Sequence, residues 1–249
     1  MNKTELKVKS NVQLADRTFE MILEAPAGLT DGFRPGQFMN ISLEGCYLRR
    51  PLSICDWSED TITIIYKTVG RGTEAMSTLQ EGALLDILLP LGNGYNTEDG
   101  NIGERPVLIG GGAGVPPMYC LCRRLVSEGL VPTVVLGFRT ASEMFYIERF
   151  REMNIDVAVA TEDGSYGVKG FVTDLLSDLE YTSFFACGPE GMLRAIDSNA
   201  KADLPGWFSF EERMGCGFGA CMGCSCETKY GSKRICKDGP VLERSEIIW

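Results

Sequence analysis

Four cysteines near the C-terminal end of this 249-residue chain have a spacing that is typical of metal binding. They follow the pattern Cys216-x4-Cys221-x2-Cys224-x11-Cys236. A C-x4-C-x2-C run with a distant fourth cysteine is the arrangement by which plant-type ferredoxins hold a [2Fe–2S] cluster. The interleaved glycines allow the backbone to curl around such a cluster and to aim N–H groups at its sulfur atoms. The pattern therefore predicts an iron–sulfur site with these four thiolates as ligands.

Two other interpretations of these cysteines stay open. One is a structural zinc site, although such sites usually pair two short C-x2–4-C knuckles, and Cys236 has no partner at that spacing. The other is a set of buried thiols without metal. Cys226 is a fifth cysteine within reach. We interpret Cys226 as a small packed residue, and the alternative is that it exchanges with Cys224 as a ligand.

Two runs in the first hundred residues indicate a flavin site. Arg49-Arg50-Pro51-Leu52-Ser53 opens a strand, and it offers a guanidinium for phosphate and a hydroxyl for the flavin edge. Lys67-Thr68-Val69-Gly70-Arg71-Gly72-Thr73 ends a strand and begins a short helix. A pyrophosphate is favoured there by backbone N–H groups and the positive end of the helix dipole. Each run alone is also typical of a plain strand start or a plain turn.

A glycine-rich run in the middle of the chain indicates a dinucleotide site. Gly110-Gly111-Gly112-Ala113-Gly114 lies between a predicted strand and a predicted helix, as a dinucleotide-binding loop does. Pro116-Pro117 follows it, so the run departs from G-x-G-x-x-G, and a turn without nucleotide is the alternative. Cys187-Gly188-Pro189-Glu190 follows the last predicted parallel strand, at the end where open α/β sheets bind ligands.

Composition excludes several classes of function. The chain has no histidine, which excludes histidine acid–base catalysis, Ser-His-Asp and Cys-His pairs, histidine zinc sites and Rieske ligation. A formal net charge of −10 disfavours binding to nucleic acid and to anionic membranes. The start of the chain is polar, and no apolar run approaches the roughly 18 residues of a membrane span. We therefore expect a cytoplasmic protein, where clustered cysteines favour metal or redox chemistry over disulfides.

The elements that position these residues fall into three parts. Residues 1–100 alternate between short half-buried strands and glycine-rich turns, which predicts a small antiparallel barrel or sandwich that holds the flavin. The expected strands are Thr18–Ala25, Gln37–Leu43, Leu52–Trp57, Thr61–Lys67 and Leu84–Leu89, with one short helix over Thr73–Leu79.

Residues 101–206 alternate between strand and helix patterns, which predicts a parallel α/β sheet. The expected strands are Pro106–Ile109, Thr133–Phe138, Asp156–Ala160 and Ser183–Ala186. One helix is expected around Met118–Leu125, and three more over Ser142–Met153, Val172–Leu179 and Gly191–Ala200. Residues 207–249 have little periodicity, and we expect an inorganic group to order them. The fold class is therefore mixed: an N-terminal antiparallel β-barrel, a central α/β nucleotide domain and a C-terminal [2Fe–2S] segment.

The order of these motifs resembles the ferredoxin–NADP⁺ reductase superfamily. Within it, the run EERMGCGFGACMGC over Glu211–Cys224 and the run ICKDGPV over Ile235–Val241 are more specific. Both look like the electron-transfer subunits of NAD⁺-dependent, class B dihydroorotate dehydrogenases, and the resemblance covers essentially the whole chain.

This resemblance implies three cofactors and one partner. FAD would be bound by the barrel, a [2Fe–2S] cluster by the C-terminal segment, and NAD⁺ would be the electron acceptor. The family's subunits pair with an FMN-containing catalytic subunit, commonly as two of each chain. Dihydroorotate is oxidised on the partner, and electrons then pass through the cluster and FAD to NAD⁺ in pyrimidine biosynthesis. No base for dihydroorotate chemistry, and hence no catalytic residue, is expected on this chain.

The resemblance implies functional residues for each of the three cofactors. The FAD contacts would be Arg50, Pro51, Leu52, Ser53, Lys67, Thr68, Val69, Gly72 and Thr73. The nucleotide path would run along Gly110, Gly111, Gly112, Ala113, Gly114, Cys187, Gly188 and Pro189. The iron ligands would be Cys216, Cys221, Cys224 and Cys236.

Other interpretations remain at this point. A related FAD and [2Fe–2S] reductase subunit could serve another partner, as in bifurcating ferredoxin–NADP⁺ reductases, and a non-catalytic zinc module is a further alternative. The choice between NAD and NADP depends on side chains after Thr133–Phe138, where Arg139 could reach a 2′-phosphate while the resemblance implies NAD. Met214, Phe218 and Met222 are candidates for an apolar face toward the partner.

Overall fold

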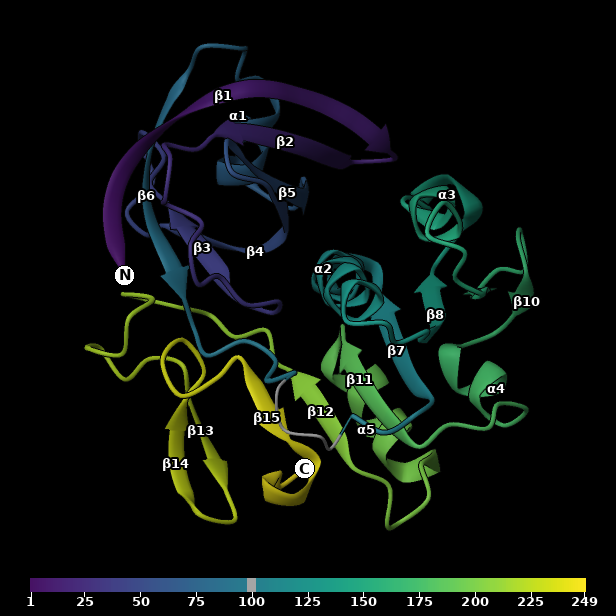
Figure 1. Cartoon of the computed structure of the whole chain (residues 1–249). Helices are drawn as coiled ribbons and strands as arrows, with labels where there is room; N and C mark the ends of the chain where they lie inside the picture. Colours follow the sequence, from purple (N-terminus) through teal and green to yellow (C-terminus); the bar gives the residue numbers. More distant parts are fainter. Residues whose placement is uncertain (98–101) are drawn as a thin grey trace.

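The computed structural model describes residues 1–97 and 102–249, and it consists of a closed barrel, a seven-stranded sheet and a C-terminal segment that joins them (Figure 1). The boundary expected between residues 100 and 101 lies outside the described residues. No helix among the described residues has both the length and the apolar character needed to cross a membrane.

The barrel confirms the antiparallel architecture that the alternating patterns predict. Its strands are hydrogen-bonded in the closed order β1-β2-β5-β4-β3-β6. Their bounds are β1 (Asn2–Ala15), β2 (Thr18–Glu24), β3 (Phe38–Ile41), β4 (Arg50–Trp57), β5 (Thr61–Lys67) and β6 (Leu84–Leu91), with the short helix α1 (Arg71–Ser77) after β5. Alternate side chains such as Met21 and Ile64 fill the interior.

The first strand is the barrel strand that the sequence patterns did not locate. β1 has 14 residues, yet only Leu6 and Val8 of this strand are buried. Lys3, Glu5 and Lys7 alternate with them on the solvent side, so most of the strand shows no apolar signal. β1 is recognised by its partners instead, because it pairs with β2 on one edge and β6 on the other and so closes the barrel.

The central sheet has the strand order β10-β9-β8-β7-β11-β12-β15, which confirms the α/β prediction. Every neighbouring pair is parallel except the last, where β15 runs antiparallel to β12. The strands are β7 (Pro106–Gly111), β8 (Thr133–Phe138), β9 (Val157–Thr161), β10 (Val168–Lys169), β11 (Ser183–Cys187), β12 (Gly206–Ser209) and β15 (Val241–Glu243). The helices are α2 (Val115–Ser127), α3 (Ile147–Arg151), α4 (Val172–Leu176) and α5 (Glu190–Asn199).

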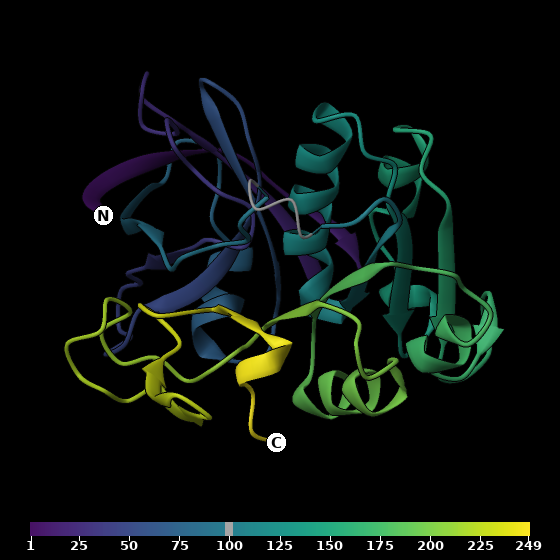
Figure 2. The ribbon, with the colours of Figure 1, turned by 60° about the horizontal axis from the view of Figure 1, so that its bottom comes forward.

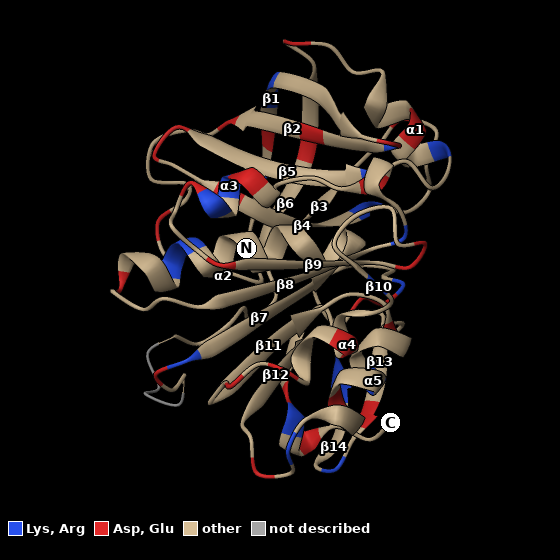
Figure 3. Ribbon diagram, turned by 90° about the vertical axis from the view of Figure 1, so that its right-hand side faces the viewer, with Lys and Arg blue, Asp and Glu red and all other residues tan. Residues whose placement is uncertain are grey.

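Helices cover both faces of this sheet. Leu108 packs with Leu121 of α2 on one face, and Ile109 packs with Leu193 of α5 on the other. Because both faces are buried, β7, β8, β9 and β11 carry no Lys, Arg, Asp or Glu, as Figure 3 shows. Helix α2 also packs against β4, so it lies between the barrel and the sheet (Figure 2).

One predicted helix is largely wrong. In place of a helix over Ser142–Met153, the chain forms a 3₁₀ turn at Ala141–Glu143, an extended residue at Met144 and then the short helix α3. Tyr146 has φ 67° before that helix begins, and its hydroxyl donates a 2.5 Å hydrogen bond to the Glu20 carboxylate of the barrel. A contact between the two halves of the molecule therefore overrides the local helical pattern.

The C-terminal segment contains more regular structure than its sequence predicts. β12 and β15 extend the central sheet, and β13 (Ser225–Thr228) and β14 (Gly231–Arg234) form a separate hairpin. These strands have three or four residues each, which is too short to show a period. Figures 1 and 2 show the segment against both the barrel and the sheet, and the Asn93 amide donates to the carbonyls of Asp238 and Val241 there.

Candidate cofactor-binding sites

The hairpin explains the spacing of the four predicted iron ligands. Cys216, Cys221 and Cys224 follow one another in the loop between β12 and β13, whereas Cys236 follows β14. The antiparallel pairing of β13 with β14 returns the chain to the end of this loop. As a result, the Cys236 N–H donates to the Sγ atom of Cys224 at 3.4 Å. The distant fourth cysteine is therefore a spatial neighbour of the third.

Backbone N–H groups surround the sulfur atoms. The Sγ atom of Cys216 accepts from the N–H groups of Ala220 at 3.2 Å and Cys221 at 3.4 Å. The Sγ atom of Cys221 accepts from the N–H of Cys216 at 3.4 Å and that of Gly223 at 3.5 Å. Gly217, at φ 80°, has the left-handed backbone that such a tight loop requires. These donors fit a negatively charged cluster, because N–H groups aimed at sulfur stabilise thiolate charge.

The Cys216 thiol bonds to the Cys221 side chain and the Cys236 thiol to that of Cys224, and the charge of Cys216 also acts on Cys236. Among residues 1–97 and 102–249, no three His, Cys, Asp or Glu side chains are placed to hold a single metal ion. Burial raises the pKa of Cys216, but N–H donation from the loop outweighs it and lowers that pKa to about 6. Burial instead raises the pKa of Cys236 to about 12. Two thiol pairs with N–H donors suit a cluster of two irons.

Cys226 occupies a different environment from these four. It lies within β13, opposite Lys233 of β14. Its half-buried side chain packs against the same apolar cluster as Cys224, and burial raises the pKa of its thiol. This placement supports its interpretation as a packed residue.

Asn40 of the barrel contacts the cysteine loop, and sequence reasoning missed it. Asn40 lies on β3 beside Pro51 of β4, and its side chain is buried. Its Nδ2 group donates to the Cys216 carbonyl oxygen at 3.3 Å, across 176 positions of sequence. A Cβ atom on Gly217 would overlap the same amide. The loop therefore rests directly on the barrel strand beside the predicted flavin motif.

The structure brings the two halves of the predicted flavin motif together. Arg50 opens β4, and its guanidinium lies so close to Gly72 of α1 that a Cβ atom at Gly72 would overlap it. The Thr73 hydroxyl accepts from the Val69 N–H at 2.9 Å and donates to the Gly70 carbonyl at 3.1 Å. These bonds fix a turn whose backbone lies beside the Arg50 guanidinium. The turn and the guanidinium together form a cradle whose chemistry suits a pyrophosphate.

The remaining predicted flavin residues have mixed surroundings. Pro51 and Ser53 pair with Asn40 and Phe38 of β3, while Leu52 packs toward the barrel core. Thr68 is buried and Val69 is exposed. Lys67 lines a cavity between the barrel and the sheet, where its ammonium group pairs with Glu143.

That cavity has a volume of about 570 Å³, which is within the range of cofactor sites. It lies at the carboxyl ends of β7, β8 and β9, where α/β sheets bind ligands. Its lining residues are Lys67, Gly111, Gly112, Ala113, Gly137, Phe138, Arg139, Glu143, Glu162, Gly170, Phe171, Val172, Thr173, Pro189, Gly191, Met192, Ala195 and Glu211.

The predicted nucleotide residues divide between this cavity and the packing behind it. Gly111, Gly112, Ala113 and Pro189 line the cavity, whereas Gly110, Gly114, Cys187 and Gly188 are not part of its lining. A Cβ atom on Gly114 would overlap the Cys187 carbonyl. This glycine therefore allows the loop after β7 to approach the end of β11. Burial raises the pKa of the Cys187 thiol, which bonds to Ser209.

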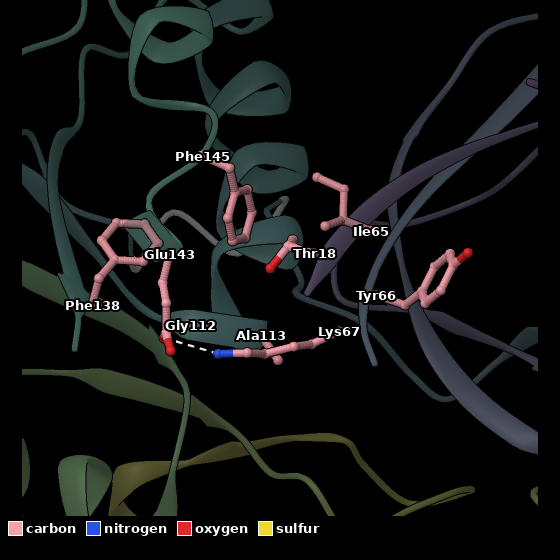
Figure 4. Close-up of a pocket in the computed structure, with 9 residues that line it drawn as sticks. All are labelled: Thr18, Ile65, Tyr66, Lys67, Gly112, Ala113, Phe138, Glu143 and Phe145. Atoms are coloured by element: carbon pink, nitrogen blue, oxygen red, sulfur yellow. Dashed lines mark ion pairs between the residues drawn. The ribbon is translucent and has the colours of Figure 1, made fainter. Parts of the chain in front are cut away.

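Three carboxylates in the cavity are further residues that sequence reasoning missed. Glu143, Glu162 and Glu211 line it together with the cations Lys67 and Arg139. Figure 4 shows the Lys67–Glu143 ion pair, 2.8 Å between Nζ and Oε2, across a smaller adjoining pocket. Glu162 follows the end of β9 and Glu211 lies two positions after β12, so the rule that ligands bind at strand ends would have found both. Glu211 is exposed to solvent at the cavity, and the protein around it removes enough water from its carboxylate to raise its pKa.

Two family models match the chain. Residues 211–248 match the iron-sulfur cluster binding domain of dihydroorotate dehydrogenase B. Residues 108–198 match the oxidoreductase NAD-binding domain. The first match spans all four predicted iron ligands, and the second spans the glycine-rich loop.

Similar proteins cover the full length of the chain. The dihydroorotate dehydrogenase B (NAD(+)), electron transfer subunit of Bacillus cereus strain G9842 is 38% identical over 260 residues, covering 100% of this chain and 99% of the relative. The subunit of the same name from Bacillus anthracis strain CDC 684 has the same identity and coverage.

Solved structures share the fold. A structure of an NADH-dependent reduced ferredoxin-NADP oxidoreductase, studied for flavin-based electron bifurcation, has a TM-score of 0.88 and 30% identity, covering 98% of this chain and 90% of its own. The Amycolatopsis cytochrome P450 reductase GcoB has a TM-score of 0.68 and 22% identity, covering 81% and 68% respectively, which shows likeness of fold.

Proposed function

Because this chain belongs to the family of dihydroorotate dehydrogenase B (NAD(+)) electron transfer subunits, we propose that it delivers electrons from a catalytic partner subunit to NAD⁺. The proposed partner contains FMN and oxidises dihydroorotate, in an assembly of two copies of each chain. The setting is pyrimidine (UMP) biosynthesis in the cytoplasm. The electron-transfer role is supported by full-length similarity to subunits of that name.

We assign one cofactor to each part of the chain. Residues 1–100 would bind FAD, residues 101–206 NAD⁺ and residues 207–249 a [2Fe–2S] cluster. Bound FAD exchanges hydride with nicotinamide and single electrons with an iron–sulfur cluster, so the three together link one-electron to two-electron chemistry. The NAD⁺ assignment is supported by the family model over 108–198 and the cluster assignment by the model over 211–248, whereas the FAD assignment is supported by the close approach of Arg50 to Gly72 in the barrel.

The residues of this chain would bind, orient and shield the three cofactors. Cys216, Cys221, Cys224 and Cys236 would hold the cluster, and the loop N–H groups would lower the energy of its negative charge. Arg50, Gly72 and Thr73 would hold the FAD pyrophosphate. Gly111–Ala113 and Pro189 would hold the nicotinamide nucleotide in the cavity. No side chain needs to act as a general base, which agrees with a chain that lacks histidine.

The observation that carries the proposal is the contact of Asn40 with Cys216. It joins the loop of the four cysteines to the barrel strand that pairs with the Arg50–Ser53 motif. Electron transfer between two cofactors requires proximity, and this contact brings their proposed binding segments together.

The test is reconstitution of the complex. The chain is co-expressed with a candidate FMN subunit, and dihydroorotate-dependent reduction of NAD⁺ is followed at the absorbance of NADH. We expect turnover with the complex and none with either subunit alone. A purified complex that holds all its cofactors and yet reduces no NAD⁺ with dihydroorotate would refute the proposal.

A second candidate is favoured by one comparison. The 30% identity and TM-score of 0.88 to the bifurcating oxidoreductase fit a reductase subunit that serves another partner. The two candidates are distinguished because the alternative predicts no dihydroorotate-dependent reduction of NAD⁺ with the FMN subunit, and predicts instead reduction of NADP⁺ by NADH and reduced ferredoxin when the chain is purified with its own partner.

A further inference from the structure

The side chains that line the 570 Å³ cavity carry more negative than positive charges. Two cations, Lys67 and Arg139, face three carboxylates, Glu143, Glu162 and Glu211. Lys67 comes from the end of barrel strand β5, whereas Arg139 follows β8 at the end of the central sheet. An anionic ligand that enters the cavity meets all five groups, so their pairing decides which anions it accepts.

Both cations are already paired with one carboxylate. Glu143 accepts from Lys67 Nζ through Oε2 at 2.8 Å and from Arg139 Nη2 through Oε1 at 2.6 Å. The Nε group of Arg139 adds a second bond to Oε1 at 3.2 Å. The Glu143 side chain is only 12% exposed, and the bond from Arg139 is the main cause that holds its pKa below the ordinary value. Glu143 is therefore ionised and engaged on both oxygens.

Glu162 places a second carboxylate near the same arginine. Its backbone N–H donates to the Phe138 carbonyl at 3.1 Å, which ties the end of β9 to the residue before Arg139. The negative charge of Glu162 acts on the Arg139 guanidinium. Within the described residues, the Glu162 carboxylate takes part in no ion pair. The charges of three carboxylates thus act on Arg139: Glu143 is bonded to it, and of the other two, Glu162 and Asp16, only Glu162 lines the cavity.

We propose that Glu143 and Glu162 determine the specificity of this cavity for NAD⁺ over NADP⁺. The inference rests on the proposed function, in which the cavity binds the nicotinamide dinucleotide. A 2′-phosphate brings close to two negative charges and needs a free cation, whereas the cations here are occupied. A 2′-hydroxyl is neutral and can donate a hydrogen bond to a carboxylate, so the same arrangement tolerates NAD⁺.

Arg139 alone would predict a preference for NADP⁺, whereas its pairing with carboxylates predicts a preference for NAD⁺. An arginine after the second strand of the sheet is the residue that accommodates the 2′-phosphate of NADP in dinucleotide-binding folds. Here the guanidinium is held by Glu143 and lies in the field of Glu162, so discrimination comes from the carboxylates.

The test compares nucleotide affinities of the holoprotein with FAD and cluster bound. Dissociation constants for NAD⁺ and NADP⁺ are measured by calorimetry for the wild type, Glu143→Gln, Glu162→Gln and the double variant. We expect the ratio Kd(NADP⁺)/Kd(NAD⁺) to fall in each single variant and by about tenfold or more in the double variant. Adding Arg139→Gln to the double variant should restore most of the wild-type ratio, because the freed guanidinium is the group that would bind the phosphate.

Glu128→Gln is the matched control. Glu128 forms an i,i+4 pair with Arg124 at 2.5 Å, as Glu143 does with Arg139, but it does not line the cavity. This change removes the same charge and should leave the ratio as in the wild type. If Glu143→Gln fails to fold, Glu162→Gln alone still tests the proposal. The Glu162 carboxylate is in no ion pair within the described residues, so this change removes no such pair from the fold.

Two results would overturn the proposal in distinguishable ways. If the wild type prefers NAD⁺ and both glutamine variants keep the same ratio, the carboxylates do not discriminate, and the proposed function stands. If the wild type with its FAD bound has no affinity for either nucleotide, the NAD⁺ site fails and this inference fails with it.

Discussion

At the scale of single residues, the cysteine loop depends on hydrogen bonds that its own sequence cannot reveal. The spacing of the four thiols predicts a cluster site because the thiols are close in the chain or joined by one hairpin. Asn40 carries no such signal, since its partner Cys216 is 176 positions away. Glu143 likewise becomes meaningful only when Lys67 and Arg139 are both seen to bond to it.

The Asn40 contact can be tested by Asn40→Ala. The change removes the donor to the Cys216 carbonyl and opens space under Gly217, and losing such a buried partner costs about 1–3 kcal/mol. We expect the cluster to be lost several times faster when the chain is incubated with a chelator and its visible absorbance is followed.

Asn11→Ala is the control for this measurement. The Asn11 amide also bonds to backbone carbonyls, those of Met76 and Leu79, but within the barrel and away from the cysteines. It should lower the melting temperature without a selective effect on the cluster. Equal rates of cluster loss in wild type and Asn40→Ala would show that the contact does not support the loop.

At the scale of elements, hydrophobic periodicity and turn residues locate most strands and helices. They fail where tertiary contacts determine the local structure. The helix expected over Ser142–Met153 is interrupted because Tyr146 adopts φ 67° and bonds to Glu20 of the barrel. β1 and β15 show little pattern because one is largely solvated and the other has three residues. The cradle of Arg50 over Gly72 joins two elements whose sequences were each ambiguous.

That cradle gives a prediction for FAD binding. In Gly72→Ala, the new Cβ overlaps the Arg50 guanidinium, which must move out of the cradle. We expect the affinity for FAD, measured by quenching of flavin fluorescence, to fall about tenfold or more, in line with a lost charge-assisted contact of roughly 1.5–3 kcal/mol.

Gly191→Ala in helix α5 is the matched control. No atom lies within 4 Å of its added Cβ, and Gly191 lines the cavity assigned to the nucleotide and not the FAD cradle. This variant should bind FAD as the wild type does. An unchanged affinity in Gly72→Ala would remove the guanidinium from the FAD site.

At the scale of the whole molecule, an apolar face next to the cysteine loop is a candidate for partner contact. Phe218 is 44% exposed and Met222 is 54% exposed, whereas Met214 is buried and belongs to the core. In the proposed function, electrons from the partner would reach the cluster through this side of the molecule, and interfaces of permanent complexes are apolar. Phe218 and Met222 therefore remain candidates for the partner contact, and Met214 does not.

Binding of the partner should stabilise the chain, because a ligand that binds only the folded state raises the free energy of unfolding. We expect the isolated chain to lose its cluster and FAD faster than the purified complex at the same temperature. Half-lives of cofactor release, followed by absorbance, provide the measurement. Equal half-lives with and without the partner would argue against an interface at the cysteine loop.

The central claim is that four particular sulfur atoms hold two irons. The most direct measurement is the content of iron and inorganic sulfide per chain in anaerobically purified wild type, Cys236→Ser and Cys226→Ser. The account predicts about two irons and two sulfides in the wild type and in Cys226→Ser, and a loss of both in Cys236→Ser. A wild type without sulfide, or a Cys226→Ser variant without iron, would contradict it.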